Sequence, residues 1–116
     1  MKYALLIYSQ AEDGLEDDGL RPIPAGIADA LGRPEVAGWL RLKHVESATT
    51  VRREQGKTLL TDGPFIDSKE FLGGIVLVEA DNLDGALAVA AELQERRPGR
   101  GPIEVRPIRE QRLAGA

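Results

Sequence analysis

The sequence has 116 residues, a length typical of one domain, and a net charge of −4 at pH 7. It contains no cysteine, which excludes disulfides, thiolate metal sites and a cysteine nucleophile. The same absence suits a reducing compartment, so we expect a cytoplasmic protein. The early apolar run, residues 3–8, is too short for a signal-peptide core or a membrane span, and we expect no membrane partner.

Charge is distributed unevenly along the chain. Acidic residues crowd residues 12–18, whereas arginines gather between residues 96 and 112. These arginines have no aromatic residues between them and are diluted by Glu104 and Glu110, so a stacking platform for nucleic acid is poorly supported. We therefore interpret the charges as solvated surface and expect no nucleic-acid partner.

The first half of the chain predicts two strands and one helix. Residues 3–8 form an apolar strand, residues 9–24 read as a loop, and residues 25–31 predict a short helix that Gly32 and Pro34 end. Ile27, Ala28 and Leu31 share one face of that helix. Residues 36–42 fit both helical and alternating patterns; we favour a strand, with polar Arg41 facing away from Leu40 and Leu42.

The second half predicts a hairpin, a strand, a helix and a last strand. Residues 48–53 and 57–61 form the hairpin around a turn at Gln55-Gly56. Residues 74–80 form a buried strand, and Asp81 caps a helix that starts near Leu83 and ends before Pro98-Gly99. Asp84 is a favourable acid in its first turn, and residues 103–106 alternate as the final strand.

This order predicts an α+β fold: a mostly antiparallel, ferredoxin-like sheet with two helices on one face, in a single domain over residues 1–116. The strands at residues 3–8 and 75–78 are apolar at successive positions, so both of their faces require burial. Two short helices cover one face only. A second copy of the sheet is the simplest cover for the other face, and we therefore expect a homodimer.

Several blocks of the chain, in the same order, resemble the YCII-related, DGPF-motif family. The most specific is Thr61-Asp62-Gly63-Pro64-Phe65, followed by Lys69-Glu70 and Leu72-Gly73-Gly74. Further blocks are residues 1–8, 48–52, 83–84 and 104–107, so the resemblance covers most of the chain outside residues 9–35. It implies a dimeric α+β barrel in which two ferredoxin-like sheets face each other.

The resemblance implies less about function. Enzymatic roles in the family rest on analogy with other dimeric α+β barrels that bind small organic molecules. Some relatives are thought to use a histidine of the first helix with an aspartate. This chain departs from that pattern, because its predicted first helix has no histidine and its one histidine, His44, follows the Trp39 segment.

Three residues are candidates for catalysis, each with a structural alternative. Asp62 either forms the turn at Gly63-Pro64 or projects a carboxylate into a pocket as a general base. Arg52 either holds an anionic substrate or forms a salt bridge with Asp62 or Glu54. His44 either acts as an acid or base, with Glu46 beside it, or is an exposed surface histidine.

Four more residues are candidates for lining a substrate pocket: Tyr8, Phe65, Lys69 and Glu70. Their alternatives are core packing for Tyr8, anchoring of the loop for Phe65, and a single helical turn capped by Asp67 for the segment with Lys69 and Glu70. No phosphate loop, nucleophile elbow or calcium loop is present, and we expect no cofactor and no metal.

The sequence thus predicts a dimeric protein that binds a small organic ligand. Cofactor-free acid–base chemistry on an organic acid or a phenolic substrate is the enzymatic form of this hypothesis. The alternative is a noncatalytic accessory or regulatory module that engages another protein. A pocket lined only by apolar side chains would favour the alternative, because ligand sites combine apolar walls with a few convergent polar groups.

Overall fold

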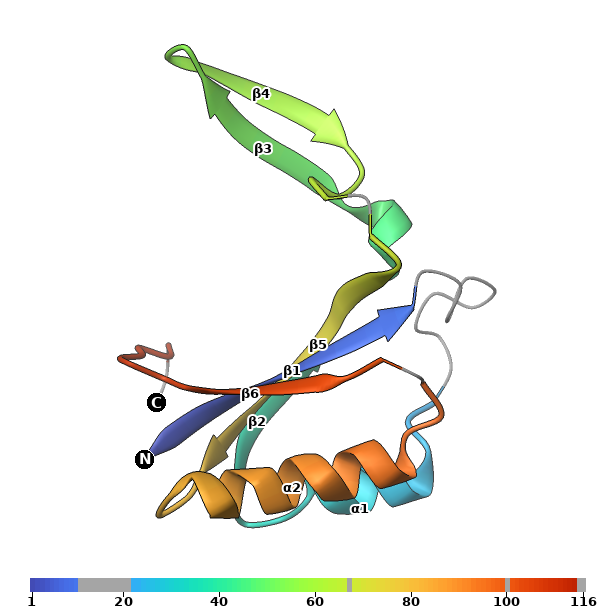
Figure 1. The fold of residues 1–116 in the computed structure, drawn as a ribbon, viewed down its shortest axis with the longest axis vertical. Helices are drawn as coiled ribbons and strands as arrows, with labels where there is room; N and C mark the ends of the chain where they lie inside the picture. Colours follow the sequence, from blue (N-terminus) through green and yellow to red (C-terminus); the bar gives the residue numbers. More distant parts are fainter. Residues whose placement is uncertain (11–21, 67, 100, 115–116) are drawn as a thin grey trace.

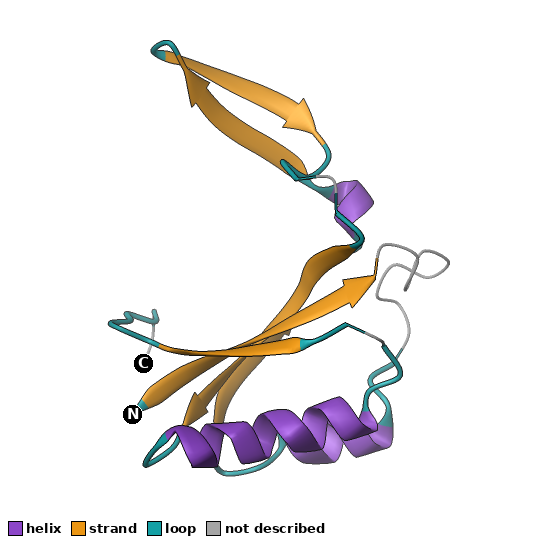
Figure 2. Ribbon diagram, in the orientation of Figure 1, coloured by secondary structure: helices purple, strands orange, loops and turns teal. Residues whose placement is uncertain are grey.

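The computed structural model describes residues 1–10, 22–66, 68–99 and 101–114, and Figures 1 and 2 show its ribbon. All the predicted strands and helices are present, together with a short 3-10 helix, η1, that the sequence did not predict. In chain order the elements are β1 (Lys2–Gln10), α1 (Ala25–Leu31), β2 (Val36–Arg41), η1 (Val45–Ser47), β3 (Thr49–Glu54), β4 (Lys57–Asp62), β5 (Glu70–Glu79), α2 (Leu83–Arg96) and β6 (Ile103–Pro107).

Four strands form one antiparallel sheet in the order β2-β5-β1-β6. The central strand β1 pairs with β5 on one side and with β6 on the other. Helices α1 and α2 lie together against the same face of this sheet, which confirms the predicted arrangement (Figure 1). In the described residues neither helix has the length and apolarity needed to cross a membrane.

The core lies between the sheet and the helices. Tyr3 and Leu5 of β1 stand opposite Val78 and Val76 of β5, and cross-strand partners project to the same face. These side chains are buried against the helices, and Leu5 has no exposed surface. The helices contribute further buried residues, which are Ala30, Ala86, Val89, Ala90 and Leu93. Because α2 supplies most of them, it is the main cover of the sheet.

The opposite face of the sheet is apolar but is not buried. Ala4 stands opposite Leu77, and Leu6 opposite Ile75, so all four project away from the helices. Each keeps part of its surface accessible. We call these four residues the open sheet face. The expectation that helices cover only one side of the apolar strands is therefore confirmed within one chain.

The helix ends refine two predictions. Asn82, not Asp81, is the N-cap of α2, because its side-chain oxygen accepts a hydrogen bond from Gly85 N–H at 3.1 Å. Asp84 lies in the first turn as predicted. In α1 the fully buried residue is Ala30, whereas Ala28, predicted to share a face with Ile27 and Leu31, is exposed. The boundaries of α1 itself match the prediction.

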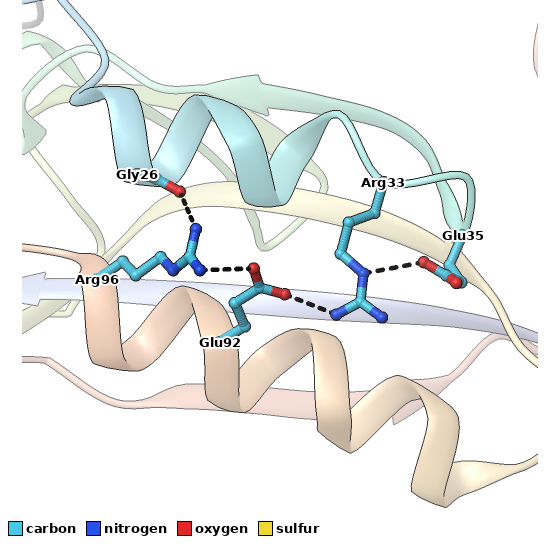
Figure 3. A network of polar contacts seen from close by, with 5 residues as sticks. All are labelled: Gly26, Arg33, Glu35, Glu92 and Arg96. Atoms are coloured by element: carbon cyan, nitrogen blue, oxygen red, sulfur yellow. Dashed lines mark hydrogen bonds and ion pairs between the residues drawn. The ribbon is translucent and has the colours of Figure 1, made fainter.

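Ion pairs fix α1 against α2 (Figure 3). Glu92 of α2 accepts from Arg33 at 2.6 Å and pairs with Arg96 at 3.3 Å. Arg96 also donates to the carbonyl of Gly26 in α1 at 3.2 Å, and Arg33 pairs with Glu35 at 3.1 Å. The hydrogen bond to Glu92, together with the charge of Glu35, raises the pKa of Arg33 above its ordinary value.

Strands β3 and β4 form a separate two-stranded hairpin that extends away from the four-stranded sheet (Figure 2). Its turn has positive φ at both central residues, 50° at Gln55 and 79° at Gly56, as tight hairpins require. The predicted turn is therefore confirmed. Every residue of the two strands is exposed except Thr50, which is half-buried.

The DGPF block closes the base of this hairpin. Gly63 follows β4 with φ of 94°, a value that suits glycine. Its N–H donates to the carbonyl of Ala48 at 2.7 Å, and its own carbonyl accepts from Thr50 Oγ1 at 2.7 Å. The two ends of the hairpin are thereby joined, and the block has a turn-forming role in the structure.

Candidate ligand pocket

A pocket of about 360 Å³ lies between α1 and the helix-facing side of the sheet. Ile27 and Leu31 of α1 form one wall, and Leu93 of α2 adds to the lining. The sheet contributes Ile7, Trp39, Phe71 and Val76. The volume falls within the range of sites that hold small organic molecules. The pocket exists because α1 is only seven residues long and leaves part of the sheet uncovered.

The strand pattern explains which side chains reach the pocket. Trp39 of β2 stands opposite Val76, and Arg41 stands opposite Gly74, so both share the helix-facing side. Trp39 keeps 46% of its surface exposed, because α1 does not cover the edge strand as completely as α2 covers the centre. An exposed indole in the wall of a pocket offers a flat apolar surface to a ligand.

Basic side chains gather at this pocket. Arg41, Lys43, His44 and Arg97 line it, and no aspartate or glutamate occurs among the described lining residues. Arg97 holds the end of β1 and the α2–β6 connection together, since it donates to the carbonyls of Tyr8 at 2.7 Å and Gly101 at 2.8 Å. Arg41, Lys43 and His44 reach the same lining from the end of β2 and the segment after it.

His44 has a defined hydrogen-bonding state. Its Nδ1 accepts a hydrogen bond from Glu46 N–H at 3.1 Å and so caps η1, while its carbonyl accepts from Ser47 Oγ at 2.7 Å. A neutral imidazole that accepts through Nδ1 carries its proton on Nε2. In this bonding pattern the ring N–H is at Nε2, and His44 contacts the neighbouring Glu46 through the backbone N–H of that residue.

The structure places the other two catalytic candidates on the hairpin, outside this pocket. Asp62 is the last residue of β4 and is exposed. Arg52 of β3 pairs with Glu54 at 3.2 Å, which is one of the salt bridges given as its structural alternative. His44 is the only one of the three that lines the described pocket. Catalytic roles for Asp62 and Arg52 stay predictions.

None of the four predicted lining residues is part of the described lining of the pocket. Tyr8 of β1 donates its N–H to the carbonyl of Pro102 at 3.0 Å. Phe65 is 73% exposed on the connection between β4 and β5. Lys69 and Glu70 are exposed at the start of β5, where Glu70 N–H donates to Ser68 Oγ at 3.2 Å. No helical turn occurs in the described part of this segment.

Sequence reasoning missed the main polar residues of the pocket. Arg41 is predicted to face away from Leu40 and Leu42, and it does; on that side it lines the pocket while its side chain stays exposed. Trp39 lies two residues before Arg41, on the same side of the strand, and Lys43 lies two residues after Arg41. An aromatic and two basic residues at this spacing were the available signal.

Comparison with known proteins identifies the family. The model of the YCII-related domain matches residues 1–112 of this chain. An uncharacterized protein of Rhizobium meliloti (strain 1021) is 41% identical over 68 residues, which are 59% of this chain and 55% of that protein. The aligned region thus spans about half the length of the relative. The chain belongs to the YCII-related domain family, as its DGPF block and the order of its other blocks predicted.

Proposed function

We propose that this protein binds a small organic acid in the pocket between α1 and the sheet. One observation carries the proposal: apolar walls and basic side chains meet in the same pocket, and its described lining has no acidic side chain. The walls, with Trp39 and Phe71, suit a carbon skeleton. Arg41 and Lys43 suit the acid group, because a guanidinium or an ammonium forms strong charge-assisted hydrogen bonds with a carboxylate.

His44 gives the proposal its enzymatic form. In the proposed complex the neutral ring donates a hydrogen bond through Nε2 to a ligand oxygen, and this bond stabilises negative charge that develops on the oxygen. The reaction class is then removal of a proton from the bound organic acid by solvent base, with the proton passing to water and the hydrogen bond from His44 stabilising the anion that remains, without a cofactor. Asp62 and Arg52 take part in this chemistry only if a ligand or a second chain brings them to the pocket.

A homodimer is part of the proposal. The open sheet face presents Ala4, Leu6, Ile75 and Leu77 to solvent in a single chain. A contiguous apolar surface on a small domain is typical of an interface, and a two-fold axis lets the same face cover itself. The noncatalytic alternative, a protein-interaction module, is supported less well, because the pocket contains the convergent polar groups that ligand sites have.

Binding of matched acids and amides tests the ligand class. We expect a panel of small aromatic and aliphatic carboxylates to raise Tm and to give measurable Kd values, and the corresponding primary amides to bind about tenfold more weakly or worse. The double variant Arg41→Met/Lys43→Met is expected to lose this preference. Arg53→Met/Lys57→Met removes the same charges from the hairpin and serves as the control. Equal binding of acids and amides would remove the anionic ligand from the proposal.

Two substitutions at His44 separate its capping role from its ligand role. His44→Asn keeps a side-chain acceptor for Glu46 N–H, whereas His44→Ala removes it. We expect both variants to weaken carboxylate binding, but only the alanine variant to lower the Tm of the free protein. If His44→Asn binds the carboxylate as tightly as the wild type does, His44 acts only as a cap.

A further inference from the structure

The two faces of the hairpin differ in chemistry. Val51 and Leu60 stand directly opposite each other, so their side chains project to the same face. They are 66% and 72% exposed. The other face carries the ion pair of Arg52 with Glu54 and one large apolar residue, Leu59. We call the first side the Val51–Leu60 face.

The described part of the chain leaves this face uncovered. Strands β3 and β4 contact each other extensively, but neither makes a comparably extensive contact with any other element. A two-stranded hairpin is at best marginally stable in water unless another surface covers it. Among the described residues, no helix or strand of the four-stranded sheet makes an extensive contact with the hairpin that would cover the exposed Val51–Leu60 pair. Another molecule is therefore the cover that we consider.

The position of the hairpin indicates what covers it. Helices α1 and α2 lie on one side of the four-stranded sheet, and the hairpin rises on the other side (Figure 1). The open sheet face, with Leu6 and Leu77, is turned to that same side. A molecule that packs on the open sheet face therefore also lies beside the hairpin. The homodimer proposed above places a second copy there.

Charges on both surfaces fit a self-complementary partner. The Val51–Leu60 face carries Arg53 near the turn and Asp62 at the base, and β6 presents Glu104 and Arg106 on the same side as Leu6 and Ala4. None of these four forms an ion pair with any residue that the structure describes. A surface with charges of both signs can face its own two-fold copy without like-charge repulsion, which a one-signed surface cannot.

We propose that the hairpin is a dimerisation arm, whose Val51–Leu60 face packs against a second copy of this chain. This inference rests on the proposed homodimer and adds a specific surface to it. The partner, rather than the four-stranded sheet of the same chain, stabilises the hairpin, and each protomer supplies one arm to the other. A second copy can cover the Val51–Leu60 face, because it brings an open sheet face and a hairpin of its own.

The reactivity of a single introduced cysteine measures whether the Val51–Leu60 face is covered. The chain has no cysteine, so Leu60→Cys introduces a unique thiol. We expect its reaction with a maleimide to be at least about tenfold slower at concentrations where the protein is dimeric than after dilution to the monomer. Glu95→Cys, an exposed site on α2, is the matched control and is expected to react at one rate throughout.

A second pair of variants keeps the same hairpin and changes one face at a time. In Val51→Thr/Leu60→Thr, threonine favours the strand conformation at two positions that are exposed in the single chain. The fold of the four-stranded sheet and the helices is therefore preserved. We expect its dimer Kd, measured by sedimentation equilibrium, to rise about a hundredfold or more. Leu59→Thr, on the opposite face, is expected to change the dimer Kd by less than about threefold.

The possible outcomes distinguish the dimerisation arm from the homodimer on which it rests. A dimeric wild type whose Leu60→Cys thiol reacts rapidly at every concentration overturns the dimerisation arm while leaving the homodimer intact. A wild type that is monomeric at high micromolar concentration overturns both. Protection of Leu60→Cys that is independent of concentration places the cover within the same chain and also overturns the arm.

Discussion

The four-stranded sheet with its two helices, here called the body, and the β3–β4 hairpin differ in how far their side chains are buried. In the body, Tyr3, Leu5 and Val78 are almost completely removed from water. In the hairpin, eleven of the twelve strand residues are exposed, and Thr50 alone is half-buried. Both parts consist of hydrogen-bonded antiparallel strands. The difference teaches that hydrogen bonding and turn chemistry define a hairpin, whereas apolar burial decides which molecule stabilises it.

The largest expected effect tests burial in the two parts. Leu5→Ala should lower the free energy of unfolding by about 2–5 kcal/mol, because the side chain is fully buried between sheet and α2. Leu60→Ala, at submicromolar concentration, should change it by about 0.5 kcal/mol or less, since Leu60 is exposed in the single chain. Urea denaturation followed by circular dichroism measures both. Comparable losses would mean that the chain covers its own hairpin.

Glycine substitutions sharpen the comparison at an intermediate scale. A Cβ at Gly101, in the body, would meet the carbonyl group of Tyr8, with the carbonyl carbon at 2.6 Å, so Gly101→Ala should cost about 1–3 kcal/mol through overpacking. At Gly56, in the hairpin turn, nothing lies within 4 Å and φ is 79°, so Gly56→Ala costs about 1 kcal/mol of conformational energy only.

Thermal unfolding of both glycine variants, with Gly56→Asn as the control, distinguishes steric from conformational cost. Asparagine tolerates positive φ, so Gly56→Asn should retain most of the wild-type stability, while Gly101→Asn should be no better than Gly101→Ala. A Gly56→Asn variant as unstable as Gly56→Ala would show that something packs against the turn.

The smallest effect concerns the joint between the two parts. Thr50→Val removes the hydroxyl that donates to the carbonyl of Gly63, and should cost about 0.5–1.5 kcal/mol. The loss should be local: amide hydrogen exchange is expected to accelerate in β3 and β4 and to stay unchanged in β1 and β5. Faster exchange throughout the body would contradict the separation of the two parts.

The sequence predicted the elements well where local chemistry decides them. The bounds of α1 follow from Gly32 and Pro34, and the hairpin turn follows from Gln55-Gly56. The cap of α2 was wrong by one residue, because Asp81 and Asn82 are both good N-caps. The packing of Ala86, Val89 and Leu93 against the sheet sets the rotation of the helix, and propensity carries no information about that rotation.

The candidate site was predictable only in part. His44 was named for its chemistry, and the structure brings it to the pocket through a turn of 3-10 helix that no sequence pattern indicated. Arg41 and Trp39 were missed because alternation shows which residues share a face but not which face the short α1 leaves uncovered. That information lies in the lengths and positions of helices, which are long-range properties of the fold.

The bond between Gly63 N–H and the carbonyl of Ala48 has a consequence for how this chain can change in evolution. It brings the entry and the exit of the hairpin to one point, so residues 49–62 form an insertion whose removal or exchange disturbs no pairing of the four-stranded sheet. The entropic cost of closing the loop changes little when a shorter or longer segment replaces these residues. A lineage can therefore alter the choice of partner by rewriting one contiguous segment while the pocket is inherited unchanged.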